Sequence, residues 1–397
     1  MDSKPKILVL AQTNIISGAE TVMGEYIANN RDVEVMVYTN TLSSVRRYFE
    51  ELLGSASVLS AGSMRSYLVK KNPLLLPLYL WNLMLNVWRA INIANRNGIN
   101  VIYGNNSTDL GTLCFIKLLK GQKFRVIAHC HDMLTMKTLP GMYLKIFSRL
   151  LDVVLVPSQA TKSRLELLCH RNCDIRVIYN GLSLKTAMCD TEGRSSGVVQ
   201  AESQENKKVI GFVGTICHRK RPDIFLDIIR ELLLLRNNIA GVMIGKVIED
   251  DVGAEVEKRI QEEALPVRFL GEVPHDELLS LYQRFDLLVL TSDRDPLPTV
   301  LIEAMSQGCI VFARDVDGVN EIIVDGKSGY IFDYEYNVQE IVSRICQIID
   351  SNELRNYVSE RAKEVVANQF CIERKINEVN QIIREVRGET NAKCGVN

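Results

Sequence analysis

Two acidic side chains in the second half of the chain have a spacing that suits the binding of one elongated ligand. Asp295 and Glu303 are eight residues apart in the segment DRDPLPTVLIEAM, which follows the apolar run DLLVL. Pro298 fixes its own φ and suits the first turn of a helix, so we expect a helix to begin near it. The first amides of that helix, at Thr299 and Val300, would face a phosphate, because a helix N-terminus favours negative charge.

The positions of the two acids predict different roles. Glu303 would lie about a turn and a half inside the helix, where a carboxylate can accept both hydroxyls of a ribose. Asp295 precedes the helix and would reach the other end of the same ligand. For isolated acids, capping and solvation would be the better explanation. The choice between a ligand site and a solvated surface therefore depends on the surrounding loops.

Two loops in the first half of the chain carry groups suited to a polar ligand. The loop Gln12–Glu20 holds Gly18 at a helix start, where small residues let backbone amides approach an anion, although Ser-Gly is also an ordinary helix cap. The stretch AHCHD follows an apolar run and contains His131. A histidine past a strand end can donate to a sugar hydroxyl or a phosphate, and it can equally be structural.

A basic loop opens the second half. In GTICHRKRP, the cations Arg219, Lys220 and Arg221 precede a helix that begins at Pro222. This arrangement suits a pyrophosphate, and a solvated basic turn is the competing interpretation. Lys220 is the strongest single candidate.

The elements that must position these loops follow from the apolar pattern. Short β-branched runs alternate with helical patterns from residue 6 to 178 and again from 208 to 350, which predicts parallel strands joined by crossover helices. A chain of 397 residues is also too long for one ordinary core. We therefore expect an α/β protein with two doubly wound, Rossmann-like domains, and ligand-binding loops at a cleft between them.

Composition narrows the class of protein. The chain is 47% hydrophobic and 24% charged, its ten cysteines have no framework spacing, and the start MDSKPKILVL has no apolar signal region. These features favour a soluble protein of a reducing cytosol. His129-Cys130-His131 and Cys169-His170-x-x-Cys173 have no matching second pair of ligands, so we expect no metal.

Charge and apolar residues are unevenly distributed. Residues 1–185 hold 22 basic and 12 acidic side chains, against 25 and 36 in the remainder. A basic half suits an anionic partner such as a phospholipid surface, or is simply a difference between two solvated domains. The run from 72 to 88 has no charge, contains Trp81 and Trp88, and is shorter than the roughly 20 residues of a membrane span. An interfacial anchor and a helix packed on its own domain both remain open.

With these loops in order, the chain resembles the retaining family 4 glycosyltransferases, which have the two-domain GT-B fold. The most specific phrase is the motif E-x7-E, here Asp295 to Glu303, followed by AMSQG. Similar phrases are SGAE at 17–20, VPSQ at 156–159, VIYNG at 177–181, LGEVP at 270–274, DGVNE at 317–321 and DGKSGY at 325–330. The resemblance covers nearly the whole chain and is strongest from 207 to 333.

The resemblance implies both the domain boundaries and the roles of single residues. It implies an acceptor-binding domain at 1–184, a linker at 185–207, a nucleotide-sugar-binding domain at 208–370, and a C-terminal helix at 371–397 that crosses back to the first domain. In order along the implied donor, Glu272 and Val273 would lie near the base, Glu303 would bind the ribose, and Lys220 would bind the diphosphate together with the amides near Thr299 and Val300. Asp295 would bind hydroxyls of the transferred sugar, and His131 would contact that sugar near its anomeric carbon. Gly18 would let its loop approach the phosphate and the acceptor.

Two positions depart from the family pattern. The family often has an arginine directly after the glycine of the phosphate loop, where this chain has Thr215, and Arg219 is expected to compensate. The first acid of the motif is Asp295 instead of glutamate, which is one methylene shorter.

The function that the resemblance implies is retaining transfer of a sugar, of the hexosyltransferase type, without a metal or other cofactor. The expected partners are a nucleotide diphosphate sugar and a glycan or lipid-linked acceptor of bacterial surface polysaccharide synthesis, at the inner face of the membrane and without nucleic acid. A GT-B scaffold protein that has lost transfer, favoured by Thr215 and Asp295, and a sugar phosphorylase or epimerase on the same fold remain alternatives.

Overall fold

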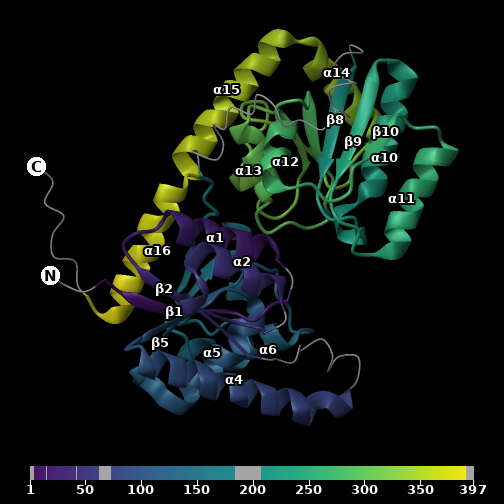
Figure 1. Cartoon of the computed structure of the whole chain (residues 1–397). Coiled ribbons are helices and arrows are strands. Elements are labelled where there is room, and N and C mark those ends of the chain that lie inside the picture. The colour runs from purple at the N-terminus through teal and green to yellow at the C-terminus, as the bar shows by residue number, and fades with distance from the viewer. Residues whose placement is uncertain (1–3, 15, 42, 62–72, 184–206, 390–397) are drawn as a thin grey trace, which may run out of the picture. The chain divides into compact units, whose positions relative to one another are not determined.

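The computed structural model of the chain describes residues 4–14, 16–41, 43–61, 73–183 and 207–389 (Figure 1). It forms two compact units, of which unit 1 comprises residues 1–181 and 372–397 and unit 2 comprises residues 182–371. The implied boundaries at 184 and 371 are close to these divisions. The expected linker at 185–207 lies outside the described residues except for Lys207.

Unit 1 is a seven-stranded parallel sheet in the order β3-β2-β1-β4-β5-β6-β7. Its strands are β1 (Lys6–Ala11), β2 (Glu34–Thr39), β3 (Val58–Ser60), β4 (Val101–Gly104), β5 (Arg125–His129), β6 (Val153–Val156) and β7 (Ile175–Val177). Its helices are α1 (Gly18–Asn29), α2 (Ser44–Leu53), α4 (Leu76–Arg96), α5 (Leu110–Lys120), α6 (Leu139–Phe147), α7 (Gln159–Glu166) and α16 (Ile372–Arg387).

The sheet of unit 1 is buried on both faces because successive residues of a strand point to opposite sides. In β1, Leu8 and Leu10 belong to a core built with α4, α5, α6 and α7. Ile7 and Val9 belong to a second core built with α1, α2 and α16. The helices therefore form one layer on each side of the sheet, which is the doubly wound arrangement expected from the sequence.

Helix α16 packs beside α1 in unit 1, although more than 340 residues separate their contacting side chains (Figure 1). The Tyr26 hydroxyl donates to Asn380 Oδ1 at 2.7 Å, and Asn30 donates to the same oxygen at 3.0 Å. Tyr26, Asn30 and Asn380 are all buried. These satisfied polar contacts fix the register of α16 on α1.

Unit 2 is a six-stranded parallel sheet in the order β10-β9-β8-β11-β12-β13. Its strands are β8 (Lys208–Val213), β9 (Ile239–Ile244), β10 (Val267–Phe269), β11 (Leu287–Leu290), β12 (Val311–Arg314) and β13 (Tyr330–Phe332). Its helices are α10 (Pro222–Leu235), α11 (Asp250–Glu262), α12 (His275–Tyr282), α13 (Thr299–Ser306), α14 (Val338–Asp350) and α15 (Asn352–Gln369).

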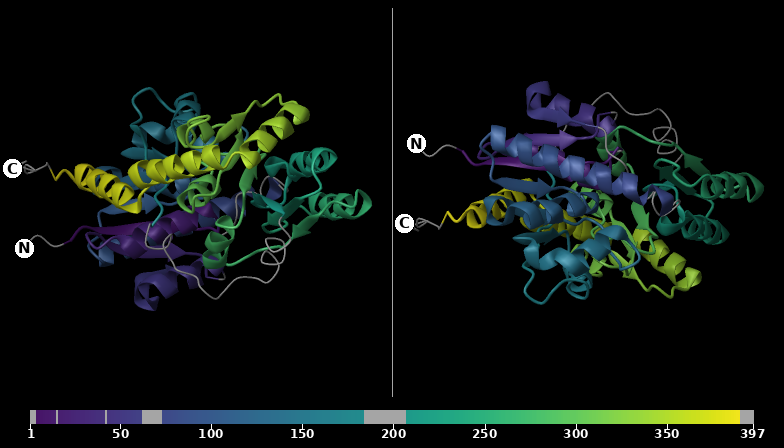
Figure 2. Two further views of the ribbon diagram at one scale, coloured as in Figure 1. Left: turned by 90° about the horizontal axis from the view of Figure 1, so that it is seen from above. Right: turned by 90° about the horizontal axis from the view of Figure 1, so that it is seen from below.

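Helix α4 contains most of the uncharged run and extends beyond it to Arg96; it lies along the outer side of unit 1 (Figure 2, right). One of its faces is buried on the domain core, including Leu83, Val87 and Ala90. The opposite face is exposed at Trp81 and Trp88. Of the described helices, none is long and apolar enough to cross a membrane.

Candidate functional site

The strand order of unit 2 identifies one place at the sheet edge where a ligand is expected. β8 lies between β9 and β11, so the chain turns to opposite sides after β8 and after β11. In open parallel sheets such a switch point, at the carboxyl ends of the strands, is where ligands bind. The loop after β8 carries Thr215, Arg219 and Lys220, and the loop after β11 carries Asp295.

Lys220 and Asp295 meet at this switch point. The lysine Nζ lies 2.6 Å from Asp295 Oδ2, and both side chains are about nine-tenths buried. An ammonium group has three N–H donors, so Lys220 can hold Asp295 and still bind a phosphate oxygen. The resemblance assigned Lys220 to the diphosphate and Asp295 to hydroxyls of the transferred sugar, and the structure brings these two side chains into direct contact.

Close backbone packing shapes the phosphate loop. Gly245, at the end of β9, has a φ of +147°, and a Cβ there would lie 1.9 Å from the carbonyl oxygen of Gly214. The ends of β8 and β9 can therefore approach each other only because position 245 is glycine. Arg221 has a left-handed backbone, with a φ of 51°, directly before α10. Strained residues of this kind concentrate at functional sites.

The other cations of the loop have partners within unit 2. The Arg219 guanidinium donates to the carbonyl oxygen of Arg294 at 2.9 Å. Arg221 pairs with Asp223 at 2.7 Å and with Asp293 at 3.3 Å. Asp293 is also paired with the buried Arg314 at the end of β12. These pairs tie the loop after β8 to the loop after β11, as the Lys220–Asp295 pair also does.

Asp317 holds the backbone of Asp295. Its Oδ2 accepts the Asp295 N–H at 2.8 Å, and the N–H of Gly318 donates to the Asp295 carbonyl at 3.3 Å. Asp317 itself has a left-handed backbone, with a φ of 38°. The Asp-Gly pair thus supplies the turn that positions Asp295.

Glu303 is positioned by a buried tyrosine from the neighbouring helix. Helix α13 begins at Thr299, directly after Pro298, as predicted. Glu303 is half-buried one turn inside it, and the hydroxyl of Tyr282 from α12 donates to Glu303 Oε2 at 3.0 Å. Burial, followed by the Glu303 charge, raises the pKa of Tyr282 well above its usual range, so the phenol remains a donor.

Glu272 and Val273 follow β10, two positions from β8 in the sheet. Glu272 is exposed, and its carboxylate lies 3.9 Å from the Lys246 amine. The N–H of Gly245 donates to the Gly271 carbonyl at 2.7 Å, which joins this loop to the end of β9. Glu272 and Val273 therefore lie on the same edge of the sheet as Lys220. The ion pair between Glu272 and Lys246 is exposed and contributes little to stability.

Unit 1 has an equivalent switch point, between β1 and β4. Glu20, in the first turn of α1, is fully buried there. Its carboxylate accepts from the Thr13 hydroxyl at 2.7 Å, the Ser17 N–H at 2.9 Å, the Ser17 hydroxyl and the Asn106 amide. Ser17 and Glu20 form a capping box, so the ordinary capping interpretation of this loop is correct. Gly18 is exposed beside it, with open space where a Cβ would stand.

Glu20→Ala is expected to lower the free energy of unfolding of unit 1 by ~2–4 kcal/mol, because it leaves several buried donors without an acceptor. Chemical denaturation followed by circular dichroism measures the change. Glu51→Ala, exposed at the end of α2, is the matched control and should change stability by less than ~0.5 kcal/mol. Equal stabilities of the two variants would contradict the role assigned to Glu20.

His131 is partly buried directly after β5, against the buried side chains of His129 and Tyr103. Its ring lies 3.9 Å from that of His129, centroid to centroid, and His129 Nδ1 is 2.7 Å from the Tyr103 hydroxyl. In the described part of the chain, neither histidine Nε2 has a hydrogen-bond partner. Burial and then the charge of Lys375 in α16 lower the pKa of His131 to about 3. His131 is therefore a neutral imidazole at physiological pH.

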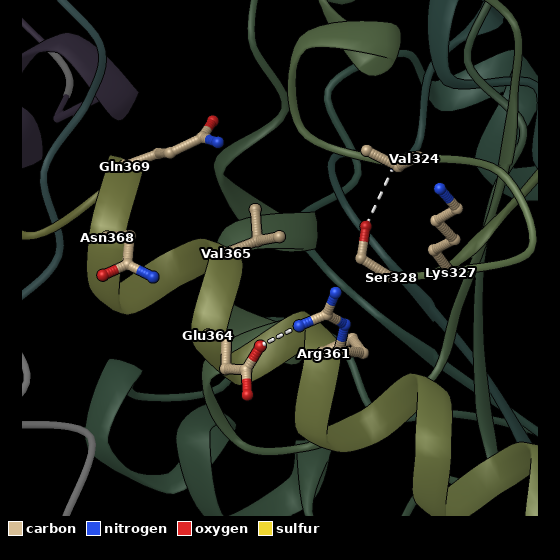
Figure 3. Close-up of a pocket in the computed structure, with 8 residues that line it drawn as sticks. All are labelled: Val324, Lys327, Ser328, Arg361, Glu364, Val365, Asn368 and Gln369. Carbon is tan, nitrogen blue, oxygen red and sulfur yellow. Dashed lines mark hydrogen bonds and ion pairs between the residues drawn. The ribbon is translucent and has the colours of Figure 1, made fainter.

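A cavity of about 220 Å³ lies elsewhere in unit 2, beside α15 (Figure 3). It is lined by Val324, Lys327, Ser328, Arg361, Glu364, Val365, Asn368 and Gln369. Arg361 is paired with Glu364 at 2.6 Å, and the Ser328 hydroxyl accepts the Val324 N–H at 3.0 Å. None of the residues predicted to bind the donor lines this cavity. Within the described residues, no group of three or more histidine, cysteine or acidic side chains is arranged to hold a metal ion.

Comparison with known families decides the class of protein. Residues 198–365 match the family described as glycosyl transferases group 1, and residues 16–186 match glycosyltransferase family 4. The chain belongs to the family 4 glycosyltransferases. Each match falls largely within one unit, and the switch point of unit 2 lies inside the first match, whereas β1 precedes the second.

Individual members of the family are distant from this chain. An alpha-D-kanosaminyltransferase of Streptomyces kanamyceticus is 25% identical over 199 residues, which are 50% of each protein. A lipopolysaccharide 1,2-N-acetylglucosaminetransferase of Salmonella typhimurium is 25% identical over 227 residues, 55% of this chain and 58% of that protein. The matches thus span 50% and 58% of the length of these two relatives.

Solved structures establish the fold of this family 4 chain. The structure of Anabaena HepE in complex with UDP and glucose has a TM-score of 0.79 at 20% identity, and the match covers 96% of this chain and 100% of that one. At this identity the likeness concerns the fold alone. Two Rossmann-like α/β domains of the GT-B class are therefore confirmed.

Sequence reasoning missed two residues that hold the family motif in place. Asp317 was quoted only as part of a family phrase, and Tyr282 was not identified. Asp317 had a signal, because an Asp-Gly pair after a strand is typical of a turn with a left-handed residue. Tyr282 had none, since its contact with Glu303 depends on how α12 packs on α13.

Tyr282→Phe is expected to weaken nucleoside diphosphate binding by about 3- to 10-fold, because it removes a hydrogen bond of ~0.5–1.5 kcal/mol from the Glu303 carboxylate. Isothermal titration with a panel of nucleoside diphosphates measures the change. In turnover, the loss should appear in KM for the donor, with kcat nearly unchanged. Tyr357→Phe, exposed on α15, is the control. Wild-type affinity in Tyr282→Phe would show that the hydroxyl does not position Glu303.

Proposed function

We propose that the chain is a retaining glycosyltransferase that moves a sugar from a nucleotide diphosphate sugar to a glycan or lipid-linked acceptor. The observation that carries the proposal is the arrangement at the switch point of unit 2. There the sheet edge brings together a buried lysine, the acid of the first motif position and the start of α13. Family membership is consistent with it.

Each part of the donor has a candidate partner in unit 2. Glu303, held by Tyr282, would bind the ribose, and Asp295 would bind hydroxyls of the sugar. Lys220 and the amides of Thr299 and Val300 would bind the diphosphate, since a cation and a helix N-terminus both favour an anion. Arg219, Thr215, Glu272 and Val273 would line the same edge, the last two near the base.

The proposed reaction breaks the bond between the anomeric carbon and the diphosphate oxygen. The electron pair leaves with the diphosphate, the acceptor oxygen bonds to the anomeric carbon on the same face, and its proton passes to the departing diphosphate. Lys220 would stabilise the charge on the leaving group, which is the largest contribution that we assign. His131, neutral and with an unpartnered buried nitrogen, would hydrogen-bond the sugar from unit 1. The proposal includes no metal or other cofactor.

We place the acceptor among bacterial surface glycans, with Gly18 and the loop after β1 on the acceptor side. A relative named as a lipopolysaccharide N-acetylglucosaminetransferase and the basic character of residues 1–185 support this choice. The test is a screen of nucleotide sugars by mass spectrometry with a membrane extract as the source of acceptor. A donor consumed with a matching mass gain in a glycan supports transfer, and no consumption of any donor contradicts it.

A second candidate function is that of a nucleotide-sugar-binding protein without transfer. It is favoured by Thr215 at the usual arginine position and by the ion pair that engages Asp295. Titration with the same donors separates the two functions, because binding without hydrolysis or transfer in the presence of the extract would support the binding protein.

A further inference from the structure

The outer face of α4 is apolar, although the opposite face already packs on the domain. Leu78, Trp81, Leu85 and Trp88 follow one another at spacings of three and four, which places them on one side of the helix. Trp81 is 65% exposed and Trp88 62% exposed. A surface helix normally presents polar residues outward, so this face is unlike that of an ordinary packed helix.

Neighbouring helices extend the same surface. α4, α5 and α6 all contribute to the core on one side of the sheet, so their outer faces belong to one layer. The hydroxyls of Tyr79 in α4 and Tyr143 in α6 lie 3.2 Å apart. α5 adds the exposed Leu118 and Leu119, and α6 adds the exposed Ile146. We call the outer faces of these three helices the α4–α6 surface.

Basic side chains accompany the apolar ones. Between residues 73 and 151 the sequence has nine Lys and Arg but two acids, of which Asp109 is buried. Lys120 at the end of α5, Lys123 in the turn that follows it, and Lys145 in α6 are exposed. This combination of exposed tryptophans, apolar residues and cations matches the interfacial zone of a membrane with anionic lipids.

We propose that the α4–α6 surface docks on a bilayer that contains anionic phospholipid. α4 lies parallel to the membrane plane, with Trp81 and Trp88 at the level of the headgroups and the exposed lysines on lipid phosphates. Because α4 is fixed to the core by Val87, Ala90 and Ile91, it binds without leaving the domain. The proposal does not rest on sugar transfer, since it concerns a surface and not the strand ends.

Trp81 and Trp88 are the two tryptophans of the chain, so intrinsic fluorescence reports directly on this surface. Titration with vesicles of phosphatidylcholine and phosphatidylglycerol in equal parts should shift the emission to the blue, and sedimentation should recover the protein with the vesicles. Vesicles of phosphatidylcholine alone should bind at least about tenfold less protein, and added salt should weaken binding to the anionic ones. Absence of binding to the anionic vesicles would overturn the proposal.

Two sets of variants test the residues. Trp81→Ser with Trp88→Ser, and separately Lys120→Gln with Lys123→Gln and Lys145→Gln, should each reduce vesicle recovery about tenfold or more with unchanged circular dichroism. The matched control is Leu234→Ser with Leu235→Ser, which removes two exposed leucines from α10 of unit 2 and should leave binding unchanged. Equal binding by the tryptophan variant overturns the proposal. Loss of a dimer in that variant, without vesicle binding by the wild type, would instead assign the surface to a second copy.

Discussion

Lys220→Met is expected to reduce sugar transfer by ~100-fold or more, because it removes the buried cation that stabilises the departing diphosphate. Affinity for nucleoside diphosphates should fall more than affinity for the corresponding nucleosides, which have no phosphate for the lysine to bind. Titration of both ligand classes and initial rates with the donor found in the screen measure the two effects. Lys258→Met, exposed on α11, should behave as the wild type.

The contact between Lys220 and Asp295 requires a second variant, since removing one partner of a buried pair leaves the other charge unpaired. Lys220→Met with Asp295→Asn removes both charges and should restore thermal stability. It should not restore transfer, because neither group can then act on the donor. Transfer near the wild-type rate in the single variant would contradict the role of Lys220. Transfer that is lost in the single variant and recovered in the double variant would also contradict it, because the loss would then come from the unpaired buried charge of Asp295.

The architecture and the start of α13 could be predicted from the sequence because they depend on local signals. Strands buried on both faces read as continuous apolar runs, as KVIGFV does in β8. Pro298 marks the start of α13 because its missing N–H is tolerated in a first turn. Family phrases located the loops, and parallel strands bring the loops at their carboxyl ends to one edge.

What could not be predicted depends on contacts across the fold. Lys220 and Asp295 are 75 residues apart, and their pairing follows from β8 and β11 being neighbours in the sheet. For α4, periodicity left open whether the uncharged run packs on its domain or is exposed, because no side of the run carries a charge. The structure shows that one face of α4 packs on the domain core and that the opposite face is exposed. Lys70 and Lys71, which precede the uncharged run in the sequence, lie outside the described residues.

Lys375 is a further residue that no local pattern identifies, and it combines burial with charge. It lies in α16, its side chain is buried, and its Nζ donates to the Val22 carbonyl of α1 at 3.2 Å. Burial lowers its pKa from 10.5 to about 7, and the nearby Glu25 charge opposes part of that shift. Burial is the main reason that the pKa of both His129 and His131 is lowered, and the charge of Lys375 adds to both shifts.

Lys375→Met should therefore change the pH dependence of stability. Between pH 7 and 10.5 the unfolded lysine keeps its proton while the folded one has released it, so the wild type gains stability as pH rises. Relative to Lys375→Met, the wild-type free energy of unfolding should increase by ~1–3 kcal/mol from pH 7 to pH 9. Below pH 7 the lysine is protonated in both the folded and the unfolded state. Burial of its charge then lowers the free energy of unfolding of the wild type relative to the variant. Denaturant titrations across this range measure the difference, with Lys137→Met, exposed in the same unit, as the control.

The same substitution separates an electrostatic role of Lys375 from simple packing. Removal of a neighbouring positive charge must raise the pKa of His131 from about 3 towards its usual value, which an NMR titration of the ring detects. A packing role alone would lower stability equally at all pH values and leave that titration in place. Parallel stability curves for wild type and Lys375→Met, together with an unchanged His131 titration, would therefore refute the electrostatic role and leave burial alone to keep the imidazole neutral.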